Sequence, residues 1–155
     1  MSRSLLLALC IITLAGCEEQ SPSGGSNGVD VPTADSVAVS RWYSDAQVLA
    51  GREVFAQHCA VCHGAQAEGA EGDWREKLDD GSLRPPPLNG SAHAWHHPQE
   101  ILLRVIDYGG QAMGGKMPEF IDVLEQDEKL AAIAFFQDFW SDEIYQQWMQ
   151  MGGTN

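Results

Sequence analysis

Cys59-Ala60-Val61-Cys62-His63 is the stretch that decides how the rest of this 155-residue chain is interpreted. Its two thiols stand three positions apart, and an imidazole directly follows the second. Each thiol of such a pair can add to one vinyl group of a porphyrin, and the adjacent imidazole then lies under the iron and supplies Nε2 as an axial ligand. The pentapeptide therefore predicts a covalent haem site, with thioethers at Cys59 and Cys62 and an iron ligand at His63.

Three other interpretations of the pentapeptide stay open at this point. A structural zinc site would use both cysteines and two histidines, but no second C-x-x-C follows in the sequence. A redox-active cysteine pair favours a strand–turn–helix setting, whereas this motif ends a predicted helix. A plain disulfide would leave His63 without a role.

Three amphipathic segments around the motif predict the main helices. Ser44 and Gln47 have the form of a capping box, which predicts a helix over residues 45–58. Pro98 at the first helical position predicts the start of a second helix, and Gly109-Gly110 predicts its end after Tyr108.

The third helix is predicted over residues 127–140, with poor capping at Gln126. The residues expected to face inward are Leu130, Ile133, Ala134, Phe135 and Phe139. Ser141 to Glu143 predicts a short further helix that carries Ile144, Tyr145 and Trp148. No convincing pair of strands appears, and so small a helical core would gain much stability from a large apolar prosthetic group.

Residues 45–141 resemble a class I cytochrome c, the family of small monohaem electron carriers. In that family the attachment motif closes the first helix, a Pro-x-Leu-like segment follows, a Met-Pro pair supplies the sixth iron ligand, and an aromatic-bearing helix ends the fold. All four features occur here in that order. The resemblance implies an all-α fold, with three main helices and long loops around one covalently attached haem c.

The resemblance also assigns roles to residues outside the pentapeptide. Pro86, in Pro86-Pro87-Leu88, is the candidate for the carbonyl that accepts the Nδ1–H of His63. Met117, in Met117-Pro118, matches the sixth ligand, and Met113 is its rival four residues earlier. Trp95 is expected to be a core residue, and the alternative is that its indole N–H donates to a haem propionate. Three residues match the packing positions between the first and last helices: Gly51, Phe55 and Phe135.

One departure from the family pattern is the loop over residues 64–84, between His63 and the Pro86 segment, which is longer than in compact members. Its acidic residues predict a solvated loop that helps to shape a partner surface. The whole chain has 9 Lys and Arg against 22 Asp and Glu, for a net charge of −13. So acidic a protein is a poor candidate for binding nucleic acid through its charge, and we expect its redox partner to present a basic patch.

The amino-terminal residues have the features of an export signal. Arg3 precedes an apolar run from Leu5 to Leu14, which is too short to span a bilayer as a helix. The run ends in Leu14-Ala15-Gly16-Cys17, which resembles the lipobox of bacterial lipoproteins and implies cleavage before Cys17 and a lipid on its thiol. Ordinary secretion with cleavage after a small residue is the alternative, and a retained anchor helix is less favoured.

These features divide the chain into three parts. Residues 1–16 are predicted to be the signal peptide, residues 17–40 a lipidated tether rich in Ser, Gly, Pro and Asp, and residues 41–155 the cytochrome c domain. The expected location is the periplasmic side of a bacterial membrane, to which the lipid on Cys17 holds the protein.

The function expected from these features is one-electron transfer between redox partner proteins, without enzymatic bond chemistry. The alternative is a haem enzyme or ligand sensor, of peroxidase-like or gas-binding type, in which Met117 leaves the iron. A third interpretation, metal storage, is weaker. Three histidines close together, His93, His96 and His97, are expected to serve as caps, core contacts or propionate neighbours rather than as a second metal site.

Overall fold

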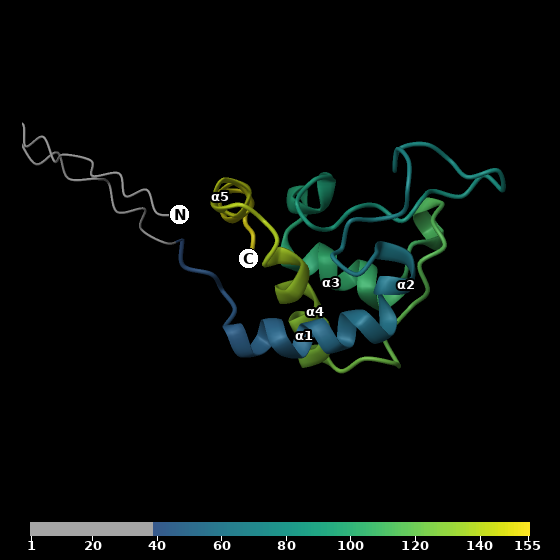
Figure 1. The fold of residues 1–155 in the computed structure, drawn as a ribbon. Helices are drawn as coiled ribbons and strands as arrows, with labels where there is room; N and C mark the ends of the chain where they lie inside the picture. The colour runs from purple at the N-terminus through teal and green to yellow at the C-terminus, as the bar shows by residue number, and fades with distance from the viewer. Residues whose placement is uncertain (1–38) are drawn as a thin grey trace, which may run out of the picture. The chain divides into compact units, whose positions relative to one another are not determined.

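The structure, a computed structural model, describes residues 39–155, which contain five α-helices and two short 3₁₀ helices joined by loops. Within that range the only β-type pairing is one isolated antiparallel bridge, between Lys77 and Leu83. The helical elements in chain order are α1 (Asp45–His58), α2 (Ala60–His63), η1 (His93–His96), α3 (Gln99–Tyr108), η2 (Gln111–Met113), α4 (Gln126–Gln137) and α5 (Asp142–Gln150). The predicted all-α class is confirmed, with α1, α3 and α4 as the main helices (Figure 1).

Helices α1 and α4 form the most extensive helix–helix contact of the described residues (Figure 1). They meet at Gly51, where an added Cβ would overlap the carbonyl oxygen of Ala131 and lie 2.9 Å from the Cβ of Phe135. The rings of Phe55 and Phe135 continue the contact, with centroids 5.0 Å apart. Because α1 leads directly into the cysteine motif, this crossing fixes where the motif lies.

The predicted helix limits are accurate for α1 and less so for the others. The Ser44–Gln47 capping box is present, and α1 spans residues 45–58 as expected. Pro98 is not the first helical residue but the N-cap of α3, with extended backbone. Gly109 ends that helix with φ +72°.

Helix α4 differs most from its prediction. It begins at Gln126 and ends at Gln137, and its cap is Glu125, which forms a reciprocal capping box with Glu128. The expected poor capping at Gln126 is therefore wrong. The short further helix is confirmed as α5, with Ser141 accepting a hydrogen bond from the backbone of Ile144.

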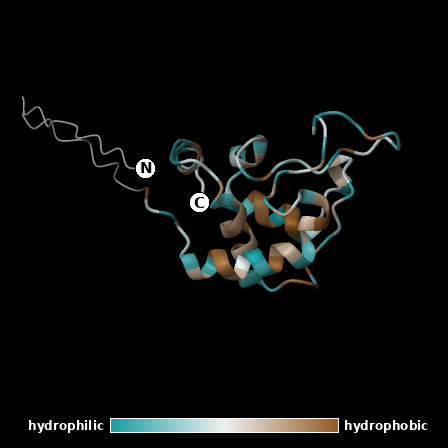
Figure 2. Ribbon diagram, in the orientation of Figure 1, coloured by the Kyte–Doolittle hydropathy of each residue, from teal (hydrophilic) through white to brown (hydrophobic). Residues whose placement is uncertain are grey.

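The core lies between α1, α3 and α4, where their apolar faces meet (Figure 2), and it extends to the buried side chains of α5. Its largest fully buried side chains are aromatic or aliphatic, with Gln137 as the polar exception, and they are Trp148, Tyr145, Phe55, Ile133 and Gln137. The expectation that Phe139 faces inward is wrong, because its side chain is 42 % exposed.

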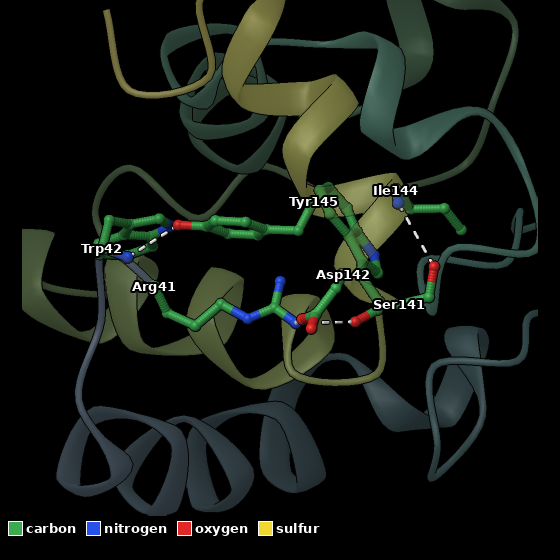
Figure 3. A network of polar contacts seen from close by, with 7 residues as sticks. Arg41, Trp42, Ser141, Asp142, Ile144 and Tyr145 are labelled. Carbon is green, nitrogen blue, oxygen red and sulfur yellow. Dashed lines mark hydrogen bonds and ion pairs between the residues drawn. The ribbon is translucent and has the colours of Figure 1, made fainter. Parts of the chain in front are cut away.

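The segment that leads into α1 is fastened to α5 (Figure 3). The backbone N–H of Trp42 donates to the hydroxyl of Tyr145 at 2.8 Å, and its indole Nε1 donates to Gln137 Oε1 at 2.6 Å. Arg41 forms an ion pair with Asp142 at 2.8 Å, and its guanidinium also lies over the Tyr145 ring, 4.2 Å from the centroid. The start of the folded region and its end therefore form one unit.

None of the helices within residues 39–155 has the length and apolar character needed to cross a membrane. The predicted signal peptide, Cys17 and nearly all of the predicted tether lie outside the described residues.

Candidate functional site

The cysteine motif lies at a break between two helices. Cys59 ends α1 by donating its backbone N–H to Phe55 and at the same time is the N-cap of α2, which contains Cys62 and His63. Gly64, with φ +77°, ends α2, and the chain leaves the helix direction at this residue. The motif therefore occupies a single short turn, with Cys59 half-buried, Cys62 exposed and His63 7 % exposed.

The surroundings of Cys59 do not favour a redox-active thiolate. Cys59 and Cys62 form no disulfide. Burial, with a smaller contribution from Cys62, raises the pKa of Cys59 to about 11. A reactive cysteine instead needs an environment that lowers its pKa. The raised pKa of Cys59 therefore disfavours the interpretation as a redox-active cysteine pair.

His63 is oriented by one hydrogen bond. Its Nδ1 lies 2.9 Å from the carbonyl oxygen of Pro86, and since a carbonyl can only accept, Nδ1 carries the proton. Burial lowers the pKa of His63, and the hydrogen bond to Pro86 opposes that shift. The result is a neutral imidazole whose Nε2 keeps its lone pair for a metal ion.

The Pro86 carbonyl is itself held in place by the chain that follows the motif. The backbone N–H of Ala70 donates to Pro85 at 3.0 Å, and that of Leu88 donates to Ala67 at 2.7 Å. Gly69 allows this close approach, since a Cβ there would lie 2.5 Å from the nitrogen of Pro87. The two hydrogen bonds flank Pro86 and fix its carbonyl toward His63.

One cavity of about 620 Å³ brings most of the predicted site residues together. Its volume lies within the usual range for cofactor pockets. Cys59, Cys62, His63, Pro86 and Met117 all line it. The rest of its surface is mainly apolar, from α3, α4 and the loops, and includes Leu78, Leu83, Leu88, Ile101, Leu102, Val105, Ile106, Phe120 and Phe136.

Met117 and its rival Met113 both line this cavity but differ in their surroundings. Met113 is 59 % exposed, whereas Met117 is half-buried and its carbonyl accepts a hydrogen bond from Gly110 at 2.9 Å. Gly109 allows this packing, because a Cβ at that position would lie 2.5 Å from the Met117 carbonyl oxygen. The structure therefore favours Met117 as the residue held in place at the cavity.

The polar groups around the cavity suit an anionic apolar cofactor. All three charged residues that line it are basic, Arg75, Arg84 and Lys116, although the whole chain carries a net charge of −13. Arg84 Nε and His93 Nδ1 are buried there without a hydrogen-bond partner. Haem combines a large apolar ring with two carboxylates, so this set of residues fits it.

Trp95 packs against the hydrophobic core, which agrees with the first of its two expected roles and not with the second. It is not among the residues that line the large cavity. It lines a smaller cleft of about 240 Å³ and stacks on His96 with centroids 3.7 Å apart. Trp74 lines the large cavity instead, stacked on His93 at 4.3 Å. Nothing in the sequence pattern distinguishes Trp74 from any other aromatic residue in a loop.

The loop over residues 64–84 is more than a solvated surface, contrary to expectation. Trp74, Leu78 and Leu83 from this loop line the cavity, and so does His58 at the end of α1.

Among the described residues, no group of three or more His, Cys, Asp or Glu side chains is arranged to hold a metal ion. Neither a zinc site at the motif nor a second metal site at His93, His96 and His97 gains support.

A comparison with known families agrees with this site. The sequence model of the family described as "Cytochrome C oxidase, cbb3-type, subunit III" matches residues 46–136, from the start of α1 to near the end of α4. No curated protein and no solved structure matches the chain. The matched region includes the cysteine motif, the Pro86 segment and Met117, and it leaves out α5 and the Arg41–Trp42 segment.

Proposed function

We propose that this protein is an exported, lipid-anchored carrier of single electrons. The chain belongs to the matched family of class I c-type cytochrome domains and is an electron-transfer protein with covalently bound haem c. The haem supplies the one-electron iron couple. The chain attaches the haem through Cys59 and Cys62, binds the iron through His63 and Met117, and keeps water away from the ring.

The observation that carries this proposal is the shared cavity. Two thiols, an imidazole with a fixed tautomer and a thioether from a distant segment all line one space of about 620 Å³. A thioether as the sixth ligand stabilises ferrous iron and fills the last coordination position. Electron transfer is then favoured over the binding of a substrate, which is why we assign the protein no enzymatic reaction.

Haem attachment is tested on full-length protein made in cells that have a cytochrome maturation system. We expect a pyridine haemochrome assay to give one haem per chain and the haem to survive acidified acetone. Replacing both cysteines, Cys59→Ala with Cys62→Ala, removes the covalent haem. A colourless product, or haem that is extracted from the wild type, contradicts the proposal.

The sixth ligand is tested with two matched substitutions. Reduced wild-type protein and Met113→Leu are expected to bind carbon monoxide only weakly, whereas Met117→Leu binds it tightly and has a lower midpoint potential. The matched pair separates loss of a ligand from loss of a methionine in the same loop. Ready binding of carbon monoxide by the wild type instead supports the ligand-sensor function.

The membrane anchor is proposed from the sequence of residues 1–17, in which an apolar run closes in Leu14-Ala15-Gly16-Cys17. The intact mass of membrane-extracted protein is expected to show cleavage before Cys17 and added acyl chains. Cys17→Ser is expected to release the domain from the membrane fraction without changing its haem content. An unmodified Cys17 in the wild type contradicts this part of the proposal.

The partner is proposed to present a basic patch, because the chain carries −13 overall. Electron transfer to such a partner slows as ionic strength rises, since salt screens the attraction that brings the two proteins together. A rate that is unaffected by salt contradicts a charge-guided encounter.

A further inference from the structure

The segment over residues 110–116, which leads into Met117, makes few polar contacts with the rest of the protein. Its hydrogen bonds from Met113 to Gly110, from Gly114 to Gln111 and from Gly115 to Gly110 stay within the segment. It has three glycines among seven residues, and Gly114 adopts the left-handed φ of +85°. Such a segment has little stiffness of its own.

Within residues 39–155, two polar contacts tie this segment to another part of the chain, and both go to residues 80–83. The backbone N–H of Leu83 donates to the carbonyl oxygen of Gly114 at 2.9 Å. The ammonium of Lys116 forms an ion pair with the carboxylate of Asp80. Residues 80–83 belong to the long loop that distinguishes this chain from compact cytochromes.

The partner side of these contacts is a well-formed turn. Asp80 accepts hydrogen bonds from the backbone N–H of Ser82 at 3.0 Å and from its hydroxyl at 2.6 Å. Leu78 donates to the Ser82 carbonyl at 2.8 Å, and Ser82 itself is buried. Leu78 and Leu83 then place their side chains at the cavity. The turn therefore contacts the cavity through Leu78 and Leu83, and it contacts the segment 110–116 through Asp80 and Leu83.

We propose that Asp80 and Leu83 are positioning residues for Met117: the turn over residues 78–83 holds the segment 110–116 against the cavity and keeps Met117 from leaving it. This inference rests on the proposed role of Met117 as the sixth ligand. It assigns the long loop a specific task, which is to make a glycine-rich ligand segment behave as a rigid one.

Carbon monoxide is the probe, because it binds ferrous haem only when the sixth position opens. Asp80→Asn keeps an oxygen for the two Ser82 hydrogen bonds and loses only the charge, and Lys116→Gln removes the other half of the ion pair. Each is expected to raise the apparent association constant for carbon monoxide about two- to fivefold, the effect of an exposed ion pair. The double variant should equal either single one, because they break the same contact.

Two control variants carry the same substitutions, Asp to Asn and Lys to Gln, at residues outside the ion pair between Asp80 and Lys116. Asp79→Asn and Lys77→Gln change neighbouring exposed residues of the same loop that make no side-chain hydrogen bond. Both are expected to keep the wild-type association constant. Leu83→Pro removes the backbone donor to Gly114 and is expected to give the largest rise, up to about tenfold.

The free energy of unfolding of each variant distinguishes positioning from general stability. If Asp80→Asn, Lys116→Gln and Leu83→Pro all keep the wild-type association constant, or change it only as much as the controls do, the inference is wrong while the electron-carrier function stands. A wild type that binds carbon monoxide as tightly as Met117→Leu does overturns the proposed function itself. A rise confined to the three contact-breaking variants, without a matching fall in global stability, supports the inference.

Discussion

The indole Nε1 of Trp140 donates a hydrogen bond of 2.7 Å to the backbone carbonyl of Leu88, 52 residues earlier in the chain. Leu88 lies two residues after Pro86, whose carbonyl orients His63. The connection between α4 and α5 thus supports the segment that fixes the proposed iron ligand, although α5 lies outside the region matched by the family.

The first prediction concerns this contact. Trp140→Phe keeps an aromatic ring but leaves the buried Leu88 carbonyl without its donor, so the free energy of unfolding should fall by about 1–3 kcal/mol. Denaturant unfolding of the haem-containing protein measures it. The control is Trp95→Phe, because no hydrogen bond from the Trp95 indole is present in the structure. Equal losses in the two variants would show that ring size, not the hydrogen bond, matters.

The second prediction concerns the crossing of α1 and α4. Gly51→Ala adds a methyl group that would overlap the Ala131 carbonyl oxygen. Overpacking of a tight core costs about 1–3 kcal/mol, which exceeds the gain in helix propensity of about 1 kcal/mol. We expect a lower melting temperature, measured by circular dichroism. Arg52→Ala, which changes an exposed neighbour in the same helix, should change the melting temperature little. A higher melting temperature for Gly51→Ala would mean that α1 and α4 can move apart without an energetic cost.

The third prediction concerns a buried ion pair between α3 and α4. Lys129 Nζ lies 2.6 Å from Asp107 Oδ1, with exposed fractions of 6 % and 23 % for the two side chains. Lys129→Met leaves Asp107 without its partner and should lower the free energy of unfolding by about 3 kcal/mol, toward the low end of the range for buried pairs because Asp107 is partly solvated. Chemical denaturation is the measurement.

Two comparisons complete that test. The double variant Lys129→Met with Asp107→Leu should recover most of the loss, since an apolar pair replaces a buried ion pair at little cost. Arg104→Met, which breaks an exposed pair with Glu100, should cost no more than about 0.5 kcal/mol. A double variant as unstable as Lys129→Met would mean that the charges themselves are required.

The sequence predicts best where structure is set by local interactions. The limits of α1 follow from Ser44 and Gln47, which interact within one turn, and the end of α3 follows from Gly109. The hydrogen bond between His63 and Pro86 spans 23 residues, and the family resemblance, not local pattern, placed it.

The errors arise where distant contacts decide. Trp74 and Trp95 are both aromatic residues in irregular segments, and only the path of the folded chain brings Trp74 to the cavity. Phe139 fits the helical period of α4, but the helix ends at Gln137 and leaves its ring 42 % exposed. The acidic loop over residues 64–84 looks solvated in sequence because its few apolar residues are far apart along the chain.

The fourth prediction concerns pH. Burial, with a further contribution from neighbouring histidines, lowers the pKa of both His93 and His97, and Arg75 adds to the shift at His93. The unfolded chain, with a histidine pKa of about 6.5, therefore binds protons before the folded protein does as pH falls. The stability from these neutral rings is complete above that value and is lost as pH falls through their folded pKa.

The measurement is the free energy of unfolding between pH 7.5 and pH 5. We expect it to decrease with falling pH in the wild type and to decrease less in the double variant His93→Gln with His97→Gln. His96→Gln removes a smaller charge contribution to both pKa shifts and leaves the burial of His93 and His97 in place, so it should reduce the slope less than the double variant does. The same slope in the double variant and the wild type would assign the pH dependence to other groups.

The attachment of Arg41 and Trp42 to α5 has a mechanical consequence. Tension that arrives along the backbone from the amino-terminal side meets the Arg41–Asp142 ion pair and the hydrogen bonds of Trp42 before it reaches α1. The load passes into α5 and the end of α4, and the helix that ends at Cys59 is shielded from strain when the domain is pulled.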